Sequence, residues 1–154
     1  MSLGVSHEKE RAVGFEIRPY QEPDITSVVS LWERCGLVVP QNDPHKDIEL
    51  KVHFQPDLFL IAQLDWQLIG TVMAGYEGHR GWLNYLAVDP EHQRKGFGRL
   101  LVEAAENRLM ELGCPKVNLL VREKDKTPLA FYRAVGYVTE DLINMGKRIE
   151  QPEE

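Results

Sequence analysis

The residues that point most directly to chemistry lie between Gln93 and Arg99, in a chain whose net charge is −6. Gly96 and Gly98 allow a tight backbone turn and let a ligand approach the main chain without meeting a Cβ atom. The apolar residues after them recur at helical spacing, and the free N–H groups at the start of a helix favour a phosphate. Three side chains add positive charge at the same place: Arg94, Lys95 and Arg99. The segment is therefore predicted to bind an anion.

Strands and helices must hold this segment in place. An apolar run at residues 82–88 predicts a strand that ends at Asp89-Pro90, and the pattern from Phe97 predicts a helix to Leu112 that Gly113 closes. Other strands are expected at residues 15–18, 58–64, 68–76, 117–121, 137–138 and 142–145, with 58–64 and 68–76 as an antiparallel hairpin. Other helices are expected from Pro23-Asp24 to near Gly36, from Asn42-Asp43-Pro44 to near residue 52, and at residues 128–135. This order indicates a mixed α/β layer.

Length and composition limit the classes of protein to which the chain can belong. A chain of 154 residues with 43% hydrophobic and 27% charged residues fits one folded domain, expected at residues 15–150 after a polar tail at residues 1–14. Met1-Ser2-Leu3 fits a cloning remnant as well as a native start. No apolar run approaches the roughly 20 residues of a membrane-spanning helix. The tail also lacks the apolar core of a secretory signal, so we expect no membrane partner.

Charge and cysteine content limit which binding partners and which cellular compartment we expect. A sequence pI near 5.4 argues against broad nucleic-acid binding, which needs a basic face. Cys35 and Cys114 provide neither a disulfide framework nor metal-ligand spacing, and His45 and His53 have no partners at such spacing. We therefore expect a reduced, cytoplasmic setting and no metal.

The motifs together resemble one family, the GNAT N-acetyltransferases. The resemblance rests on the order of a strand, Val88-Asp89-Pro90, Gln-x-x-Gly-x-Gly from Gln93, a long helix, another strand, and Phe131-Tyr132 followed by Gly136-Tyr137. It spans residues 15–148. It implies the GNAT fold, with a mixed, mostly antiparallel sheet of six or seven strands flanked by helices. It also implies transfer of an acetyl group from acetyl-coenzyme A to a primary amine in a direct ternary complex, and it allows a homodimer.

The resemblance assigns the coenzyme to the main chain around the glycine segment. Backbone amides from Lys95 to Arg99 would bind the pyrophosphate, and the strand ending at Val88 would diverge from the next strand to bind the pantetheine arm. A backbone N–H near Leu86 to Val88 would polarise the thioester carbonyl. Asp125 stands where the family often has an asparagine that touches the arm. The residues implied in coenzyme binding are Leu86, Ala87, Val88, Gln93, Arg94, Lys95, Gly96, Phe97, Gly98, Arg99 and Asp125.

The resemblance assigns the proton donor of the reaction but not the proton acceptor. Tyr132 matches the family tyrosine that protonates the leaving thiolate, and a phenol is a neutral donor at pH 7. Positions where the family often has a base hold Leu120 and Trp82, so the resemblance assigns no base. Glu77, at a strand end, is the leading candidate, and a solvated carboxylate with no role in the reaction is the alternative. A water ordered by Asn84 and Tyr85, or positioning alone, would also serve.

The amine acceptor is less defined by the sequence. Asp43, Asp47 and Glu49 lie where the family builds its acceptor pocket, where acids would hold a cationic amine; the alternative is a helix cap with a polar helix face. The missing glutamate at Leu120 favours a small molecule over a protein N-terminus. A nucleotide-binding redox domain is disfavoured because Leu101 stands where its third glycine would be. A non-catalytic acyl-coenzyme sensor on the same fold remains the alternative function.

Overall fold

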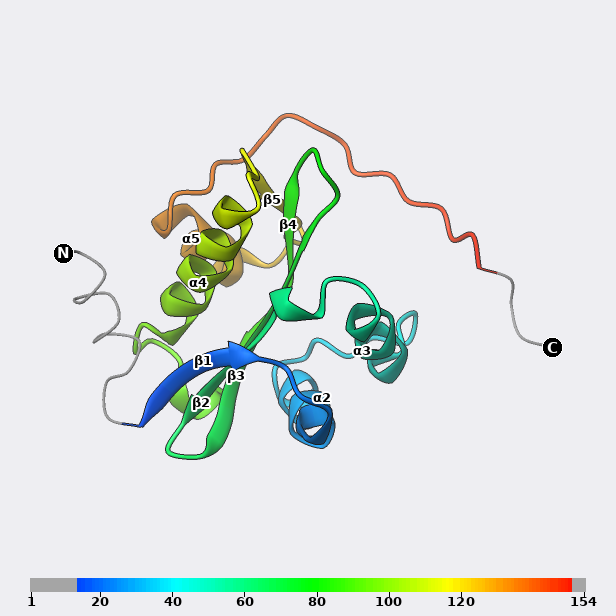
Figure 1. The fold of residues 1–154 in the computed structure, drawn as a ribbon. Helices are drawn as coiled ribbons and strands as arrows, with labels where there is room; N and C mark the ends of the chain where they lie inside the picture. The colour runs from blue at the N-terminus through cyan, green and yellow to red at the C-terminus, as the bar shows by residue number, and fades with distance from the viewer. Residues whose placement is uncertain (1–13, 151–154) are drawn as a thin grey trace. The chain divides into compact units, whose positions relative to one another are not determined.

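The computed structural model describes residues 14–150, so the expected tail lies outside the described residues except for Gly14. The chain forms five strands and four α-helices in this range, and Figure 1 colours them from blue to red along the sequence. The chain divides into two compact units, residues 1–120 (unit 1) and 121–154 (unit 2), and each is described by itself.

Unit 1 contains one sheet in which the strands follow their order in the sequence, β1 to β5. Neighbours from β1 to β4 are antiparallel, whereas β5 runs parallel to β4. The hairpin expected at residues 58–76 is confirmed as β2 and β3, joined by a two-residue turn at Asp65 and Trp66. The strands are β1 (Phe15–Pro19), β2 (Phe59–Leu64), β3 (Gln67–Tyr76), β4 (Gly81–Val88) and β5 (Val117–Leu119).

Helices cover both faces of this sheet. Successive side chains of a strand point to opposite faces, and on β3 the two faces can be told apart. A Cβ atom at Gly70 would lie 2.9 Å from Leu101 of α4 (Phe97–Glu111), whereas the Thr71 hydroxyl accepts a hydrogen bond from Trp32 of α2 (Ile25–Arg34). The small residue at 70 thus lets α4 approach the sheet closely, and α2 packs on the other face (Figure 1).

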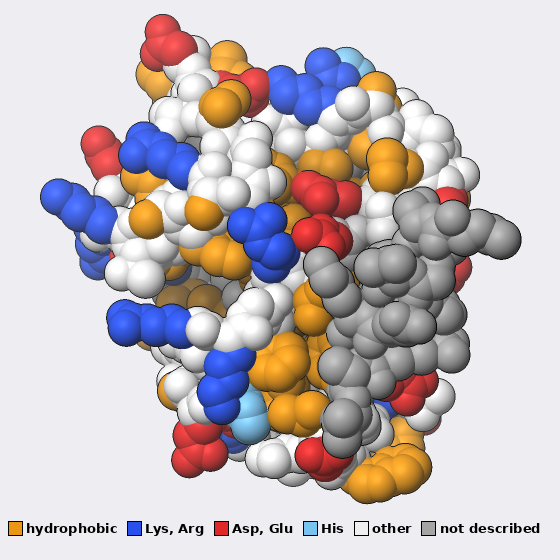
Figure 2. Space-filling model, turned by 90° about the vertical axis from the view of Figure 1, so that its left-hand side faces the viewer, with side chains coloured by type: hydrophobic (Ala, Val, Ile, Leu, Met, Phe, Trp, Pro, Cys, Tyr) orange, Lys and Arg blue, Asp and Glu red, His pale blue; other side chains and the backbone are white. Residues whose placement is uncertain are grey.

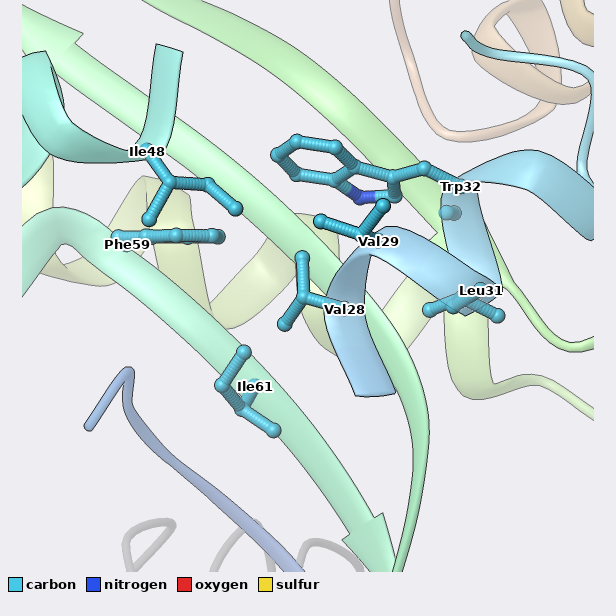
Figure 3. Packing of buried hydrophobic residues seen from close by; sticks show 8 residues of the cluster. Val28, Val29, Leu31, Trp32, Ile48, Phe59 and Ile61 are labelled. Carbon is cyan, nitrogen blue, oxygen red and sulfur yellow. The ribbon is translucent and has the colours of Figure 1, made fainter. Parts of the chain in front are cut away.

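An apolar cluster of unit 1 lies between α2 and the sheet. The apolar residues of α2 recur at helical spacing, so they form one buried stripe. They meet Ile48 of α3 (Pro44–Val52) and residues of β2 and β4, as Figure 3 shows for most of the cluster. Its fully or nearly fully buried members are Val28, Val29, Leu31, Trp32, Ile48, Phe59, Ile61 and Ala87. This packing fixes Trp32 against the centre of the sheet.

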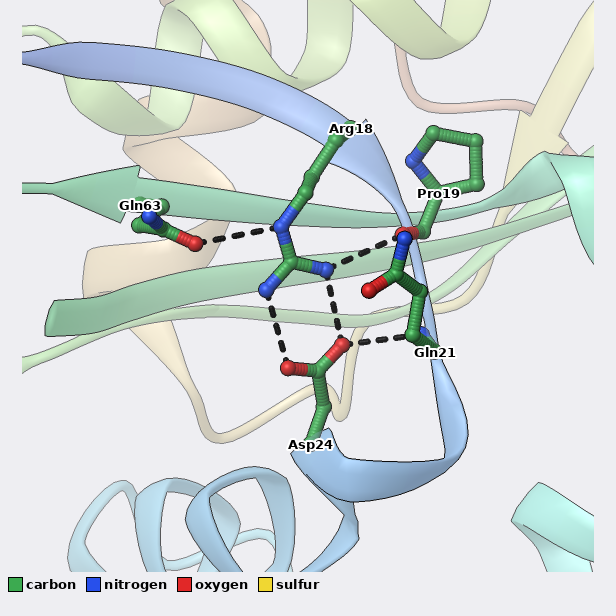
Figure 4. Close-up of polar contacts among 5 residues, drawn as sticks. All are labelled: Arg18, Pro19, Gln21, Asp24 and Gln63. Atoms are coloured by element: carbon green, nitrogen blue, oxygen red, sulfur yellow. Dashed lines mark hydrogen bonds and ion pairs between the residues drawn. The ribbon is translucent and has the colours of Figure 1, made fainter. Parts of the chain in front are cut away.

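Polar contacts fix where α2 begins. The guanidinium of Arg18 on β1 donates to both carboxylate oxygens of Asp24, at 2.8 and 2.9 Å, and to Gln63 of β2 at 3.1 Å (Figure 4). Asp24 also accepts from the backbone N–H of Gln21. Burial alone would raise the pKa of Asp24, but the hydrogen bonds from Arg18 and Gln21 hold it below its usual range. A short 3-10 turn, Glu22–Asp24, therefore precedes α2.

α3 and the segment after it cover a free edge of β3. β2 begins at Phe59 opposite Met73, so Ala74 and the residues beyond it have no partner in β2. The ammonium of Lys51 donates to the carbonyl of Ala74, and the Gln55 side chain bonds both the N–H and the C=O of Tyr76. Burial lowers the pKa of Lys51 to about 8. The expected cap of α3 is confirmed, since the Asp43 carboxylate accepts from the N–H of His45 at 3.0 Å.

The last strands predicted from the sequence are absent from the described residues. Unit 2 has one helix there, α5 (Lys126–Ala134), and residues 137–138 and 142–145 form no strand. β5 also ends at Leu119, two residues earlier than predicted. The described residues therefore form five strands where six or seven were predicted, whereas the predicted mixed, mostly antiparallel sheet flanked by helices is confirmed. Alternating apolar residues favour an extended backbone, but a strand also requires a neighbour, which local sequence does not specify.

Candidate functional site

β4 parts from β5 halfway along its length. Gly81, Trp82 and Leu83 pair with Val117, Asn118 and Leu119, and no later β4 residue has a β5 partner. β4 itself continues to Val88, paired with β3 alone. The divergence expected at this point is present. It leaves the edge of β4 from Asn84 to Val88 available to an extended ligand, which could add to it as a strand does.

A β-bulge interrupts β4 where this open edge begins. Thr71 of β3 lies opposite Ala87, whereas Met73 lies opposite Asn84. Two β4 residues, Tyr85 and Leu86, therefore oppose one residue of β3 and are displaced from the regular ladder. Tyr85 has φ of +51°, in the left-handed region that residues other than glycine rarely adopt. Such a conformation persists only where surrounding contacts impose it.

Three contacts impose it on Tyr85. Its ring stacks on the buried indole of Trp32, with ring centroids 3.7 Å apart and planes 9° apart. Its carbonyl accepts a 2.8 Å hydrogen bond from the Thr71 hydroxyl, which in turn accepts one of 2.9 Å from the Trp32 indole N–H. Its own hydroxyl donates to the carboxylate of Asp47 on α3 at 2.6 Å. Burial, followed by this hydrogen bond, raises the pKa of Tyr85, so the phenol stays protonated.

The chain after β4 forms a compact turn that leads into α4. The Asp89 carboxylate is buried and accepts from the N–H of Glu91 at 3.0 Å and from Arg34 of α2 at 2.8 Å. Burial acts to raise the pKa of Asp89, but these two bonds hold it below its usual range. The Gln93 side chain donates to the carbonyl of Val88 at 2.9 Å. Gln93 is thus brought directly to the end of β4.

The glycine segment presents the start of α4. Gly96 is the N-cap residue, with φ of +90°, and a Cβ atom there would meet nothing within 4 Å. The first backbone bond of the helix runs from Leu100 N–H to Gly96 C=O. The N–H groups of Phe97 and Gly98 therefore have no intrahelical partner. Phe97 anchors the turn, since its ring stacks on Phe15 at 5.0 Å.

Cationic side chains lie at this helix start. Arg94 has φ of +64°, and both Arg94 and Lys95 are exposed, with no ion pair to another described residue. Arg99 is exposed on the first turn of α4. Figure 2 shows the left-hand side of the view in Figure 1, where Lys and Arg side chains stand singly or in small groups among apolar, uncharged and acidic side chains.

Unit 2 carries the tyrosine and the aspartate that the sequence singled out. Tyr132 lies on α5, and its ring makes edge contacts with Phe131 and Tyr137 at 5.3 and 5.9 Å between centroids. Burial raises the pKa of Tyr132 to about 12. Asp125 is the N-cap residue of α5 but its side chain makes no capping bond. Tyr132 is thus a neutral phenol at physiological pH.

Glu77 lies in the turn between β3 and β4, at the other end of β4 from the glycine segment. Its carboxylate accepts hydrogen bonds from the N–H groups of His79 and Arg80, which lower its pKa. Tyr85 lies four positions after Gly81 along β4, roughly 13 Å at about 3.3 Å per residue. The carboxylate is thus held in a turn, has a lowered pKa and lies far from the bulge. This geometry fits a turn-stabilising residue better than a base.

One residue of this arrangement, Thr71, was not indicated by any pattern in the sequence. Thr71 is fully buried in an apolar strand, and its hydroxyl connects α2 to the bulge. A hydroxyl buried in such a strand must find a hydrogen-bond partner, but the partner lies far away along the chain. Within residues 14–150 no group of three or more His, Cys, Asp or Glu side chains could hold a metal ion. Nor is any helix there long and apolar enough to cross a bilayer.

The structure therefore collects most of the predicted coenzyme residues in unit 1. The open edge of β4 supplies Leu86, Ala87 and Val88, the turn supplies Gln93, Arg94, Lys95 and Gly96, and α4 begins with Phe97, Gly98 and Arg99. Tyr132 and Asp125 belong to unit 2.

Comparisons with known proteins identify the family. The family model of the GNAT acetyltransferases matches residues 25–137. A protein of Yersinia pestis (strain Pestoides F) named acetyltransferase is 43% identical over 134 residues, which cover 87% of this chain and 95% of that protein.

Solved structures share the fold at lower identity. Ard1 from Thermoplasma volcanium has a TM-score of 0.74 at 22% identity, covering 82% of this chain and 84% of that one. The PaiA N-acetyltransferase from Thermoplasma acidophilum, solved in complex with coenzyme A, has a TM-score of 0.71 at 22% identity, covering 84% of this chain and 92% of that one. The family match and the close relative together show that this chain belongs to the GNAT family of acetyltransferases.

Proposed function

We propose that this acetyltransferase transfers an acetyl group from acetyl-coenzyme A to a primary amine in a ternary complex, and that residues 15–150 act as one domain. The observation that carries the proposal is the course of β4. Its pairing with β5 stops at Leu83, its open edge continues to Val88, and a turn leads from there to the exposed start of α4. An edge, a turn and a helix start in this order fit an elongated ligand that ends in phosphates.

The residues present fit coenzyme A. The main chain from Leu86 to Val88 would pair with the amide groups of the pantetheine arm. The N–H groups at the start of α4 would bind the pyrophosphate, because they are unpaired within the helix and lie at its positive end. Arg94 and Lys95 are exposed, and each would contribute modestly to phosphate binding.

The bulge of β4 supplies the group that promotes the reaction. A backbone N–H displaced from the ladder at Leu86 would donate to the thioester carbonyl and stabilise the negative charge that develops on its oxygen. The amine nitrogen attacks the carbonyl carbon, a C–N bond forms and the C–S bond breaks. Before the attack the ammonium loses one proton to water or to a base, because only the neutral amine has the lone pair that forms the bond. Tyr132 gives its phenolic proton to the departing sulfur and regains a proton from the nitrogen, which loses its second proton as the amide forms.

The acceptor is proposed to be a small-molecule amine that binds as a cation. Asp47 is half-buried beside the bulge and has a neutral phenol as its hydrogen-bond partner. Its carboxylate therefore lies near the point where the amine must arrive. A protein amine remains the alternative acceptor, while a cytoplasmic location and a homodimer remain predictions. The sensor alternative is less favoured, since the close relative is named an acetyltransferase.

Release of coenzyme A across a panel of amines tests this proposal. The panel contains a polyamine, free amino acids, an aminoglycoside, a lysine peptide and a peptide with a free N-terminus. We expect one class to give turnover that is first order in enzyme and to yield a product heavier by one acetyl group in mass spectrometry. Tight acetyl-coenzyme A binding with no turnover for any amine would favour the sensor, and binding of NADH alone would contradict the donor.

A further inference from the structure

We propose that the side chain of Tyr85 is a positioning residue for acetyl transfer: anchored by Asp47, Thr71 and Trp32, it holds the bulge of β4 in its reactive conformation. The inference rests on the proposed function, because it assigns the bulge N–H the role described above. It goes further in naming which side chains set the backbone there.

The contacts around Tyr85 act at three different parts of the residue. Trp32 covers the ring, Thr71 binds the carbonyl, and Asp47 binds the hydroxyl. They come from α2, β3 and α3, so three separately packed elements converge on one residue of β4. The left-handed φ of Tyr85 is unfavourable for a residue with a Cβ atom. Convergent contacts are the condition under which such a conformation is retained.

The hydroxyl contact separates positioning from ordinary core packing. Stacking on Trp32 would bury the ring equally well without a hydroxyl, as it would for phenylalanine. The hydroxyl instead reaches a half-buried carboxylate on α3, at the short distance of 2.6 Å that is typical of a bond to a charged acceptor. This bond fixes the position of the far end of the ring and, through the Cβ atom, limits the backbone rotation at residue 85.

The consequence is a link from α3 to the reacting group. Asp47 holds Tyr85, and Tyr85 precedes Leu86, whose N–H faces the thioester carbonyl in the proposed reaction. Asp47 therefore acts through Tyr85 on the donor side of the reaction, in addition to its charge near the acceptor. Loss of the bond is expected to impair the chemical step more than the binding of acetyl-coenzyme A, which depends on the rest of the edge and on α4.

Steady-state kinetics of four variants test the proposal. Tyr85→Phe and Asp47→Ala each remove the bond, whereas Asp47→Asn keeps an oxygen that accepts it. We expect kcat to fall about five- to twentyfold in the first two and to recover to within about threefold of wild type in Asp47→Asn. The KM for acetyl-coenzyme A should stay within about twofold. Tyr85→Phe combined with Asp47→Ala should be no worse than either alone, because both remove the same bond.

Tyr20→Phe is the matched control. Tyr20 also stacks on a buried aromatic ring, that of Phe59, with centroids 4.8 Å apart, and is not part of the proposed site. Its kcat should match that of wild type. Amide hydrogen exchange gives a readout that needs no substrate: exchange at residues 85–87 should accelerate in Tyr85→Phe and Asp47→Ala but not in Asp47→Asn.

Several results would overturn the inference. One is an unchanged kcat in Tyr85→Phe, and another is a rise in KM for acetyl-coenzyme A or for the amine without a fall in kcat. Additive losses of kcat in the double variant, or unchanged exchange at residues 85–87, would also contradict it. A lower unfolding temperature with wild-type kcat would show a purely structural role. Failure of the proposed function looks different, since wild type itself would then show no turnover while the exchange result still decides the inference.

Discussion

The two halves of β4 share a strand and differ in nearly every other respect. From Gly81 to Leu83 the strand is paired on both sides in regular register, and a short turn that includes Glu77 precedes it. From Asn84 to Val88 it is paired on one side, interrupted by a bulge and followed by the turn into α4. A Cβ atom at Gly81 would lie 2.9 Å from Cys114 and 3.0 Å from Leu109, so the first half is closely packed.

With the proposed function, the first half of the strand serves stability and the second half serves the reaction. In the first half both rows of backbone hydrogen bonds are used within the sheet. In the second half the row facing away from β3 remains available to a ligand. The conformational cost of the bulge at Tyr85 is offset by contacts from α2, β3 and α3. Substitutions that act on the open half should change turnover or coenzyme binding, and those near the paired half should change stability.

The largest effect is expected for Tyr132→Phe, which tests whether the open half needs a proton donor from unit 2. Removing the phenol should lower kcat by well over tenfold, with little change in the Kd of acetyl-coenzyme A. Because the pKa of Tyr132 is about 12, its deprotonation should not limit the rate of wild type below about pH 11. Stopped-flow or steady-state kinetics with calorimetric binding check this, and unchanged turnover would remove Tyr132 from the mechanism.

A smaller effect is expected for Arg94→Ala combined with Lys95→Ala, at the turn that follows the open half. Exposed charge contacts contribute about 0.2–1 kcal/mol each. The Kd of coenzyme A should therefore rise about two- to thirtyfold at low salt, with kcat unaffected at saturation. The difference from wild type should shrink near 1 M salt, because exposed charges are then screened. An equal loss of binding at all salt concentrations would contradict the electrostatic role.

Lys51→Met tests the paired half through stability. The unfolded lysine titrates near pH 10.4, and burial lowers its pKa to about 8 in the folded chain. The unfolded chain therefore binds more protons between these values, so the contribution of Lys51 to stability is complete above about pH 10.4 and is lost as the pH falls through about 8. The Tm of wild type should rise relative to that of the variant between pH 8 and 10. A constant difference would contradict the burial of the ammonium, and turnover at pH 8 should be similar in both proteins.

The smallest effect is expected for Glu77→Gln. The amide oxygen can still accept the hydrogen bonds of His79 and Arg80, so the turn should persist while the basic group is lost. We expect kcat to remain within about twofold of wild type over pH 6–9. A fall of a hundredfold or more would restore Glu77 as the general base and would break the proposed division of β4.

Much of this division could be predicted from the sequence, but its central feature, the bulge of β4, could not. The glycines, the cap at Asp43 and the β2–β3 hairpin depend on neighbouring residues, and local patterns predict them. The bulge depends on a register shift against β3 and on contacts from Trp32 and Asp47, which lie 53 and 38 residues before Tyr85. Tyrosine has no local preference for a left-handed φ that would have indicated it. The predicted strands at residues 137–138 and 142–145 failed for the same reason, since a strand needs a partner that local sequence does not name.

Amide hydrogen exchange with and without acetyl-coenzyme A tests the central claim most directly. The claim is that the open half of β4 and the start of α4 bind the donor. Saturating acetyl-coenzyme A should slow exchange at residues 85–88 and 95–99 and leave residues 77–83 unchanged. Slower exchange confined to residues 77–83, or none at all under conditions where calorimetry shows binding, would contradict the account.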